Sequence, residues 1–216
     1  MLERILEPLE RGTDVAAGFY RPIAESFLQV YAAAATLPDE DEFPSGWMPS
    51  SRSIAFRREA FESAGGYPEW LDVGEDMYFN HRLRDRGARM ELAPRAVAYW
   101  RMRPTLGATW RQYLGYAFGD GASGMYPHRH LLRFATYGFL FATLARRRPW
   151  MVAAAAVGSV AYARRPLERA RSRIPAGSPD RLRAMAAVPA LMAFIDAAKM
   201  WGYVRGLAAR TKRPNR

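Results

Sequence analysis

The chain of 216 residues is long enough for one medium domain with its own core, or for a small domain with an appendage. It contains no cysteine, which excludes disulfide frameworks, thiolate zinc sites and cysteine nucleophiles. The net charge of +11 is unevenly placed: residues 1–145 carry 16 Lys and Arg against 18 Asp and Glu, whereas residues 146–216 carry 16 against 3. A nearly neutral part is therefore followed by a strongly basic tail.

The first 36 residues favour two short helical stretches on either side of residues 15–20, with apolar positions such as Phe27 and Tyr31 at helical spacing. The charged residues 1–7 have no apolar core of a secretory signal and do not indicate export. Four consecutive acids, residues 39–42, cannot all converge on one ion, so we expect a solvated loop there.

Alternation begins at residue 51 and predicts a strand over residues 51–57. A helix over residues 57–64 should end at Gly65-Gly66, and a second helix should run from Gly74 to Arg86 and end at Gly87, because glycine takes the left-handed cap conformation readily. Short strands are expected over residues 89–92 and 97–100.

Beyond Pro104 we expect a helix through residues 110–116 that breaks at Gly119-Asp120-Gly121. Two apolar runs follow, residues 134–145 and 150–163, and neither reaches the roughly 18 residues of a transmembrane helix. A third, amphipathic stretch covers roughly residues 184–207. His81, His128 and His130 have the pattern of ordinary surface residues, without an acidic partner at ligand spacing.

The acidic pair Glu75-Asp76 stands where the second helix begins, so its carboxylates face the partly positive end of a helix. A carboxylate held ionised in a cleft can accept a proton from a sugar hydroxyl. The alternative is that one of the two acids only caps the helix.

Five segments occur in a fixed order: residues 50–58 (SSRSIAFRR), 65–71 (GGYPEWL), 74–76 (GED), 82–87 (RLRDRG) and 111–121 (RQYLGYAFGDG). Each segment is unspecific, but in this order they resemble family 2 glycosyltransferases over roughly residues 10–135. The resemblance implies an α/β fold of the GT-A type, a nucleotide-sugar donor, a divalent cation (Mg²⁺ or Mn²⁺) and inversion by single displacement.

By position, Asp76 matches the base that deprotonates the acceptor hydroxyl, and Glu75 is its companion. Arg111 and Gln112 match positions near the diphosphate, where an arginine would stabilise the leaving group; a surface salt bridge is the alternative for Arg111. Ser51 and Trp70 are candidates for donor or acceptor binding. Trp47, Trp70 and Trp110 have the chemistry to stack on sugars, or belong to the core.

The chain also departs from that family. The Asp-rich segment that holds the metal is absent, as is the preceding nucleotide-binding half, so no metal ligand is predicted here. Gly115 and Tyr116 stand where a fuller Gln-x-x-Arg-Trp motif has Arg and Trp, and residues 98–100 (AYW) stand where many relatives have a histidine. We therefore expect an incomplete GT-A-like unit, a partial mixed sheet with flanking helices over residues 1–130, followed by an α-helical basic region over residues 131–216. The chain is then either a fragment of an enzyme, truncated or split, or a catalytically inactive remnant or membrane-bound interaction module.

Apolar segments edged by arginines in the tail favour an anionic membrane surface, and the positive charge favours its cytoplasmic face, with peripheral binding or short inserted helices. A nucleic-acid partner is not expected, because the tail lacks a recognisable binding module. A plain helical appendage is the remaining alternative. The acceptor would be a lipid-linked or cell-envelope glycan.

Overall fold

The computed structural model describes residues 1–43 and 47–211, and it separates into two compact units. The first unit comprises residues 1–23 and 37–101, and the second comprises residues 24–36 and 102–216, of which residues 212–216 lie outside the described part. The chain therefore leaves the first unit for one helix and returns to it. The division predicted at residue 130 follows the family resemblance and stays a prediction.

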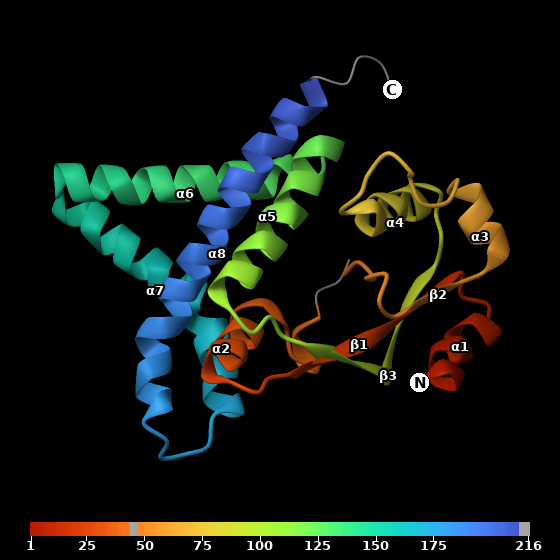
Figure 1. The fold of residues 1–216 in the computed structure, drawn as a ribbon, viewed down its shortest axis with the longest axis horizontal. Helices are drawn as coiled ribbons and strands as arrows, with labels where there is room; N and C mark the ends of the chain where they lie inside the picture. The colour runs from red at the N-terminus through yellow and green to blue at the C-terminus, as the bar shows by residue number, and fades with distance from the viewer. Residues whose placement is uncertain (44–46, 212–216) are drawn as a thin grey trace. The chain divides into compact units, whose positions relative to one another are not determined.

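The first unit is built on a mixed sheet of three strands in the order β2-β1-β3 (Figure 1). β1 (Val15–Ile23) pairs antiparallel with β2 (Ile54–Phe56) and parallel with β3 (Met90–Arg101). The register between β1 and β3 shifts after Gly18, where a side chain would overlap Ser53 and the carbonyl of Ala96. The predicted α/β class, with a mixed sheet and flanking helices, is confirmed.

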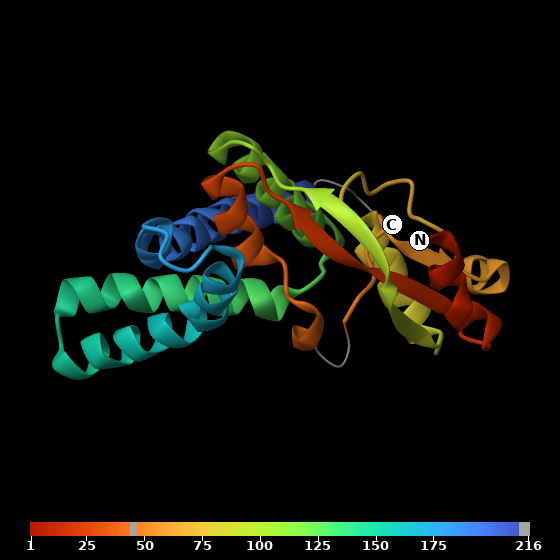
Figure 2. The same ribbon diagram turned by 90° about the horizontal axis from the view of Figure 1, so that it is seen from below.

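Helices cover both faces of this sheet. α1 (Leu2–Glu10) packs through Ile5 against Ala16, Ala93 and Ala96. On the other side of β1, Val15 packs with residues of α4 (Glu75–Asp85) and the end of α3 (Arg58–Ser63). Figure 2 shows α4, in yellow, beside the strands β1 and β3. The buried side chains of this second cluster are Val15, Ala64, Phe79 and Leu83.

The predicted helix ends at glycine are confirmed, because Gly65 (φ +74°) follows α3 and Gly87 (φ +77°) follows α4. The two predicted strands at residues 89–92 and 97–100 form one strand, β3. Two short helical stretches were expected around residues 15–20, and the central strand β1 was not predicted there. The strand forms because it pairs with a strand on each side, and Val15, Ala16 and Ala17 are almost completely buried.

The second unit consists of helices: α2 (Phe27–Thr36), α5 (Leu106–Ser123), α6 (Pro127–Arg146), α7 (Pro149–Arg173) and α8 (Asp180–Thr211). α2 is fixed to this unit by three hydrogen bonds, among them Gln29 Nε2 to the carbonyl of Met102 (2.7 Å) and Tyr31 OH to the carbonyl of Asp180 (3.3 Å). The expected helical tail is confirmed for its described residues.

The predicted break of α5 at Gly119-Asp120-Gly121 is wrong, since the helix continues to Ser123. Glycines in α5 and α8 bring the two backbones into contact: a Cβ on Gly121 would overlap the carbonyl of Tyr203, and a Cβ on Gly202 would overlap the carbonyl of Leu114. Gly121 is therefore kept in the helix by close packing, which a sequence shows only when the partner helix is known.

Candidate functional site

Asp76 lies in the first turn of α4, which begins after Gly74 (φ +87°). Its Oδ1 accepts the backbone N–H of Met77 (2.8 Å), and its Oδ2 accepts the backbone N–H of Ser51 (3.2 Å). The carboxylate thus joins the start of α4 to the segment that precedes β2. Asp76 is half-buried, and a carboxylate has about four acceptor positions, so two remain for a ligand.

A tyrosine of the sheet lies near this carboxylate, and a tryptophan of the sheet packs against that tyrosine. Tyr20 on β1 donates its hydroxyl to the carbonyl of Ser50 (3.2 Å); burial raises the pKa of Tyr20, and the charge of Asp76 raises it further. The ring of Trp100 on β3 meets that of Tyr20 edge-on at 6.3 Å, and the guanidinium of Arg52 lies 4.1 Å above the Trp100 ring.

This group occupies a defined edge of the sheet. β1 and β3 are parallel, and Tyr20 and Trp100 lie in their carboxyl-terminal halves. β2 runs the other way, so the segment before it, with Ser51, begins at the same edge. In open α/β sheets ligands bind outside the carboxyl ends of the parallel strands. Asp76 therefore stands where the topology favours a ligand.

Glu75 and Trp70, which were also predicted as site residues, lie in the same part of the first unit. Glu75 directly precedes Asp76 in α4. The two carboxylates lie near Tyr67, because burial and then the charges of Asp76 and Glu75 raise the pKa of this tyrosine. Trp70 packs edge-on against Tyr78 of α4 with ring centroids 5.4 Å apart. It is half-buried, so part of its indole surface is accessible beside the helix.

Arg111 and Gln112 lie on α5 in the second unit. Gln112 accepts a hydrogen bond from Arg103 Nε (2.9 Å) and donates one to the hydroxyl of Tyr116 (2.9 Å), while Arg111 is exposed. The six predicted residues thus form two sets: Ser51, Trp70, Glu75 and Asp76 in the first unit, and Arg111 and Gln112 in the second. A donor-binding role for Arg111 and Gln112 stays a prediction.

The divalent cation implied by the resemblance does not fit the residues present. Within residues 1–43 and 47–211, no three His, Asp or Glu side chains gather at ligand distance. In the acidic segment, the 3₁₀ turn η1 (Glu40–Glu42) directs Glu42 to the backbone N–H of Asp39 (2.8 Å), and Glu40 pairs with Arg21 (3.7 Å).

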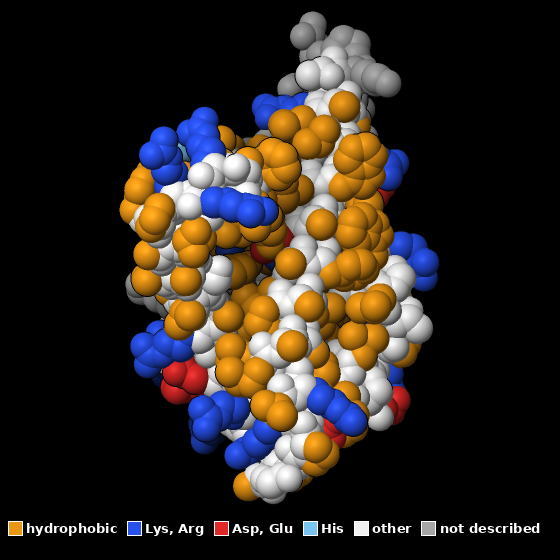
Figure 3. Space-filling model, turned by 90° about the vertical axis from the view of Figure 1, so that its left-hand side faces the viewer, with side chains coloured by type: hydrophobic (Ala, Val, Ile, Leu, Met, Phe, Trp, Pro, Cys, Tyr) orange, Lys and Arg blue, Asp and Glu red, His pale blue; other side chains and the backbone are white. Residues whose placement is uncertain are grey.

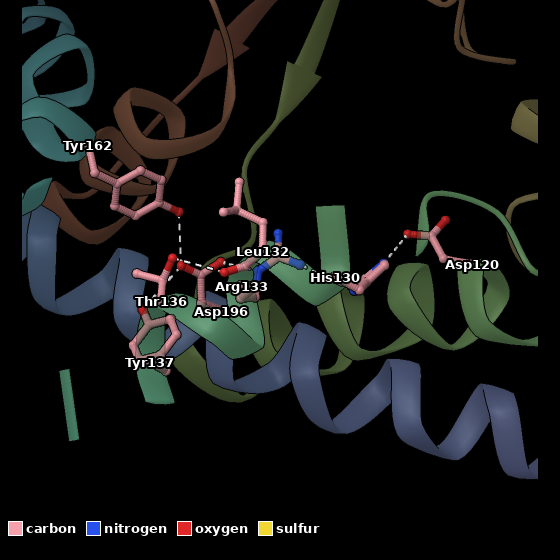
Figure 4. Close-up of polar contacts among 8 residues, drawn as sticks. All are labelled: Asp120, His130, Leu132, Arg133, Thr136, Tyr137, Tyr162 and Asp196. Carbon is pink, nitrogen blue, oxygen red and sulfur yellow. Dashed lines mark hydrogen bonds and ion pairs between the residues drawn. The ribbon is translucent and has the colours of Figure 1, made fainter. Parts of the chain in front are cut away.

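One histidine expected at the surface is buried, so that expectation is wrong. His130 on α6 is 3% exposed, stacks on Tyr203 with centroids 3.8 Å apart, and bonds Asp120 through Nε2 (2.9 Å, Figure 4). Arg133 donates to its Nδ1 (3.2 Å), which leaves the proton of a neutral ring on Nε2. The i, i+3 spacing of His130 and Arg133 was the only sequence signal, because Asp120 and Tyr203 lie on other helices.

Sequence reasoning also missed a buried carboxylate in the tail. Asp196 on α8 is 3% exposed and accepts hydrogen bonds from Arg133 Nε (2.7 Å), Tyr162 OH (2.9 Å) and Tyr137 OH (3.1 Å). Burial, followed by the charge of Asp196, raises the pKa of both tyrosines. An aspartate alone among apolar neighbours in residues 184–207 was the available signal.

Comparison with known protein families, with curated proteins and with solved structures found no match to this chain.

Proposed function

We propose that this chain carries the acceptor side of an inverting glycosyltransferase site, with Asp76 as the general base. The observation that carries the proposal is the position of the Asp76 carboxylate, which the backbone N–H of Ser51 orients at the carboxyl edge of the parallel strands near Tyr20, whose ring packs on Trp100. A half-buried carboxylate in the first turn of a helix is chemically able to accept a proton from a sugar hydroxyl within hydrogen-bond reach.

In the proposed step an acceptor hydroxyl donates a hydrogen bond to Asp76. The hydroxyl oxygen attacks the anomeric carbon of a nucleotide sugar, the new carbon–oxygen bond forms as the bond to the diphosphate breaks, and the proton passes to Asp76. The nucleoside diphosphate leaves with the electron pair of the broken bond. The exposed parts of Trp70 and Trp100 offer apolar faces for the acceptor sugar.

We also propose that the second unit binds the surface of an anionic membrane. Large apolar side chains on α6 and α7 are exposed, including Phe141 (75%), Leu144 (74%) and Val157 (71%), and Figure 3 shows hydrophobic side chains gathered on one face with arginines and lysines around them. Such a face fits the headgroup region of a bilayer. The acceptor would then be lipid-linked or a cell-envelope glycan at the cytoplasmic face.

Among the described residues, α8 is the one helix long and apolar enough to cross a membrane. The same composition fits a core helix equally, because 39% of its most apolar stretch is buried in the unit. Peripheral binding through α6 and α7 needs no spanning helix and agrees better with the close packing of α8 on α5.

A second candidate function is that of a catalytically inactive, membrane-bound module. It is favoured by one observation: both Asp76 oxygens already accept a backbone N–H, so the carboxylate has a structural task without any substrate.

The test is sugar transfer by the complete enzyme, this chain joined to the nucleotide-binding half that the resemblance implies, given a panel of radiolabelled nucleotide sugars and a membrane lipid extract, with label counted in the organic phase. Asp76→Asn should lower transfer by about 100-fold or more, the usual contribution of a general base. The matched control is Asp72→Asn, an exposed carboxylate in the loop that precedes α4, and should keep the wild-type rate.

Thermal unfolding of both variants should stay close to that of the wild type, because Asn keeps an acceptor oxygen for one of the two N–H groups. Near-normal turnover in Asp76→Asn would overturn the base assignment. A complete wild-type enzyme that transfers no sugar from any donor would overturn the catalytic proposal and support the inactive module.

A further inference from the structure

A pocket of about 440 Å³ lies among α6, α7 and α8, entirely within the second unit. This volume falls in the range of roughly 300–1,000 Å³ that is typical of small-molecule sites. Most of the wall is apolar, with Leu132, Phe139 and Leu140 from α6 and Pro189, Met192 and Ala193 from α8. Figure 3 shows this face hollowed among hydrophobic side chains.

Small residues on α7 create the space. Ala154, Ala155, Gly158 and Ser159 face the pocket, and a Cβ on Gly158 would meet no atom within 4 Å. Small residues at such spacing let helices approach closely, as Gly202 and Gly121 do between α8 and α5. Between α6 and α7 they instead leave an apolar volume without a protein occupant.

The pocket has one polar end. Asp196 lines it together with its partners Arg133, Tyr137 and Tyr162, which hold the carboxylate as drawn in Figure 4. Because Arg133 balances the charge of Asp196, the exposed Arg129 contributes a net positive charge to the lining. A negatively charged group is the complement of this end.

The apolar end lies further along the hairpin of α6 and α7. Leu140 is 11 residues after Arg129, a distance of roughly 16 Å along a helix. α7 folds back from α6 after a short connection, at an angle that opens away from it (Figure 1). By their distance from that connection, Ala154 and Ala155 lie at the end of the pocket that holds Phe139 and Leu140.

We infer that this pocket binds one molecule of an anionic lipid, with a hydrocarbon chain between α6 and α7 and a phosphate or carboxylate headgroup at Arg129. An elongated apolar volume with a single cationic end matches an amphiphile, whereas a sugar or a nucleotide would leave its hydroxyl groups without partners along the apolar wall. The exposed apolar residues around the hairpin, such as Phe141, provide a route for the chain from a bilayer.

This inference goes beyond binding of the chain to a membrane surface, because it predicts saturable binding of one lipid in the absence of any bilayer. It does not depend on glycosyl transfer. A chain that transfers no sugar would still bind the lipid, and loss of lipid binding in a pocket variant would leave the Asp76 assignment untouched.

The experiment measures binding of dodecyl phosphate, below its critical micelle concentration, to the purified full chain by equilibrium dialysis and native mass spectrometry. We expect one bound molecule per chain, with an affinity at least tenfold higher than for dodecanol or dodecyltrimethylammonium. Gly158→Leu should lower the affinity at least tenfold by filling the pocket. The matched control is Gly138→Leu on α6, where a Cβ also meets no atom within 4 Å but which does not line the pocket, and it should bind as the wild type does.

The headgroup is tested separately by Arg129→Gln, which should remove the preference for phosphate over the alcohol, whereas Arg146→Gln at the far end of α6 should keep it. The inference is overturned if no saturable binding occurs, or if Gly158→Leu binds normally while remaining folded. Equal binding of all three headgroups would overturn the role of Arg129. A chain that dimerises through this face, dissociates on Gly158→Leu and binds no dodecyl phosphate would make a second copy the occupant.

Discussion

Arg133 on α6 and Asp196 on α8 form an ion pair in the interior of the second unit, with Nε and Oδ1 2.7 Å apart and side chains 17% and 4% exposed. The two residues are 63 positions apart in the sequence, so the pair fixes how two long helices meet. Tyr137 and Tyr162 complete the coordination of the carboxylate from α6 and α7. One aspartate thus joins three helices.

Removal of this carboxylate should be strongly destabilising. Asp196→Leu leaves the guanidinium of Arg133 and the hydroxyls of Tyr137 and Tyr162 without their acceptor, and breaking one side of a buried ion pair costs about 3–5 kcal/mol. Urea denaturation measures the free energy of unfolding. Glu168→Gln, which breaks the exposed pair between Arg164 and Glu168, is the control and should leave the free energy of unfolding nearly unchanged. Equal effects of the two substitutions would contradict the buried role of Asp196.

The close approach of α5 and α8 should depend on glycine at position 202. Gly202→Ala places a methyl group on the carbonyl oxygen of Leu114, and overpacking of this kind costs about 1–3 kcal/mol. Gly115→Ala on α5 is the control, because a Cβ there meets no atom within 4 Å, and it should stabilise the helix by up to about 1 kcal/mol. Opposite shifts of the melting temperature would confirm the packing, and two stabilising substitutions would refute it.

The roles of the glycines show which features of the fold could be predicted from the sequence. Glycine ended α3 and α4 as expected, because Gly65 and Gly87 act through local backbone conformation alone. Gly121 is also a glycine, but it lies inside α5. It leaves room for the backbone of α8, which lies more than 80 positions later in the sequence. A single sequence records the first kind of role and not the second.

In the candidate site, too, the sequence predicted residues in local motifs and missed residues that meet only through pairing of distant strands. Asp76, Glu75 and Ser51 were predicted, and the structure brings Ser51 and Asp76 into contact because their segments adjoin the same strand edge. Tyr20 was missed, since β1 was not predicted as a strand; its run of completely buried Val15, Ala16 and Ala17 is the continuous apolar signal of a central strand. Trp100 and Tyr20 meet only through the pairing of β1 with β3.

Binding to anionic vesicles should depend on the exposed aromatic residues at the α6–α7 connection. Phe141 and Trp150 are 75% and 66% exposed, and each contributes roughly 1.5–3 kcal/mol when an apolar surface covers it completely. Phe141→Ser and Trp150→Ser should each weaken co-sedimentation with phosphatidylglycerol vesicles by about tenfold.

The control for the vesicle experiment is Leu2→Ser on α1, which is 76% exposed but lies in the first unit. It should bind vesicles as the wild type does. Binding should also fall as salt is raised, since the arginines at the edges of the apolar segments act through screened charges. Unchanged binding of both aromatic variants would refute the proposed membrane face.

The stability of the second unit should rise with pH because of Lys199. Burial and the nearby positive charge of Arg133 lower the pKa of Lys199 to about 8, despite the opposing charges of Asp196 and Asp120, and its Nζ lies 5.0 Å from the ring centroid of Tyr113. Between pH 8 and the ordinary value of 10.5 the unfolded chain keeps this proton while the folded chain releases it. The free energy of unfolding therefore increases with pH across this window.

Urea denaturation at pH 7.5 and pH 9.5, below the titration of ordinary tyrosines, measures this dependence. The wild type should gain about 1–2 kcal/mol between the two values relative to Lys199→Met, which has no proton to release. Arg205→Met, an exposed cation on the same helix, should retain the wild-type rise. If Lys199→Met shows the same rise as the wild type, Lys199 has an ordinary pKa and the gain comes from other groups.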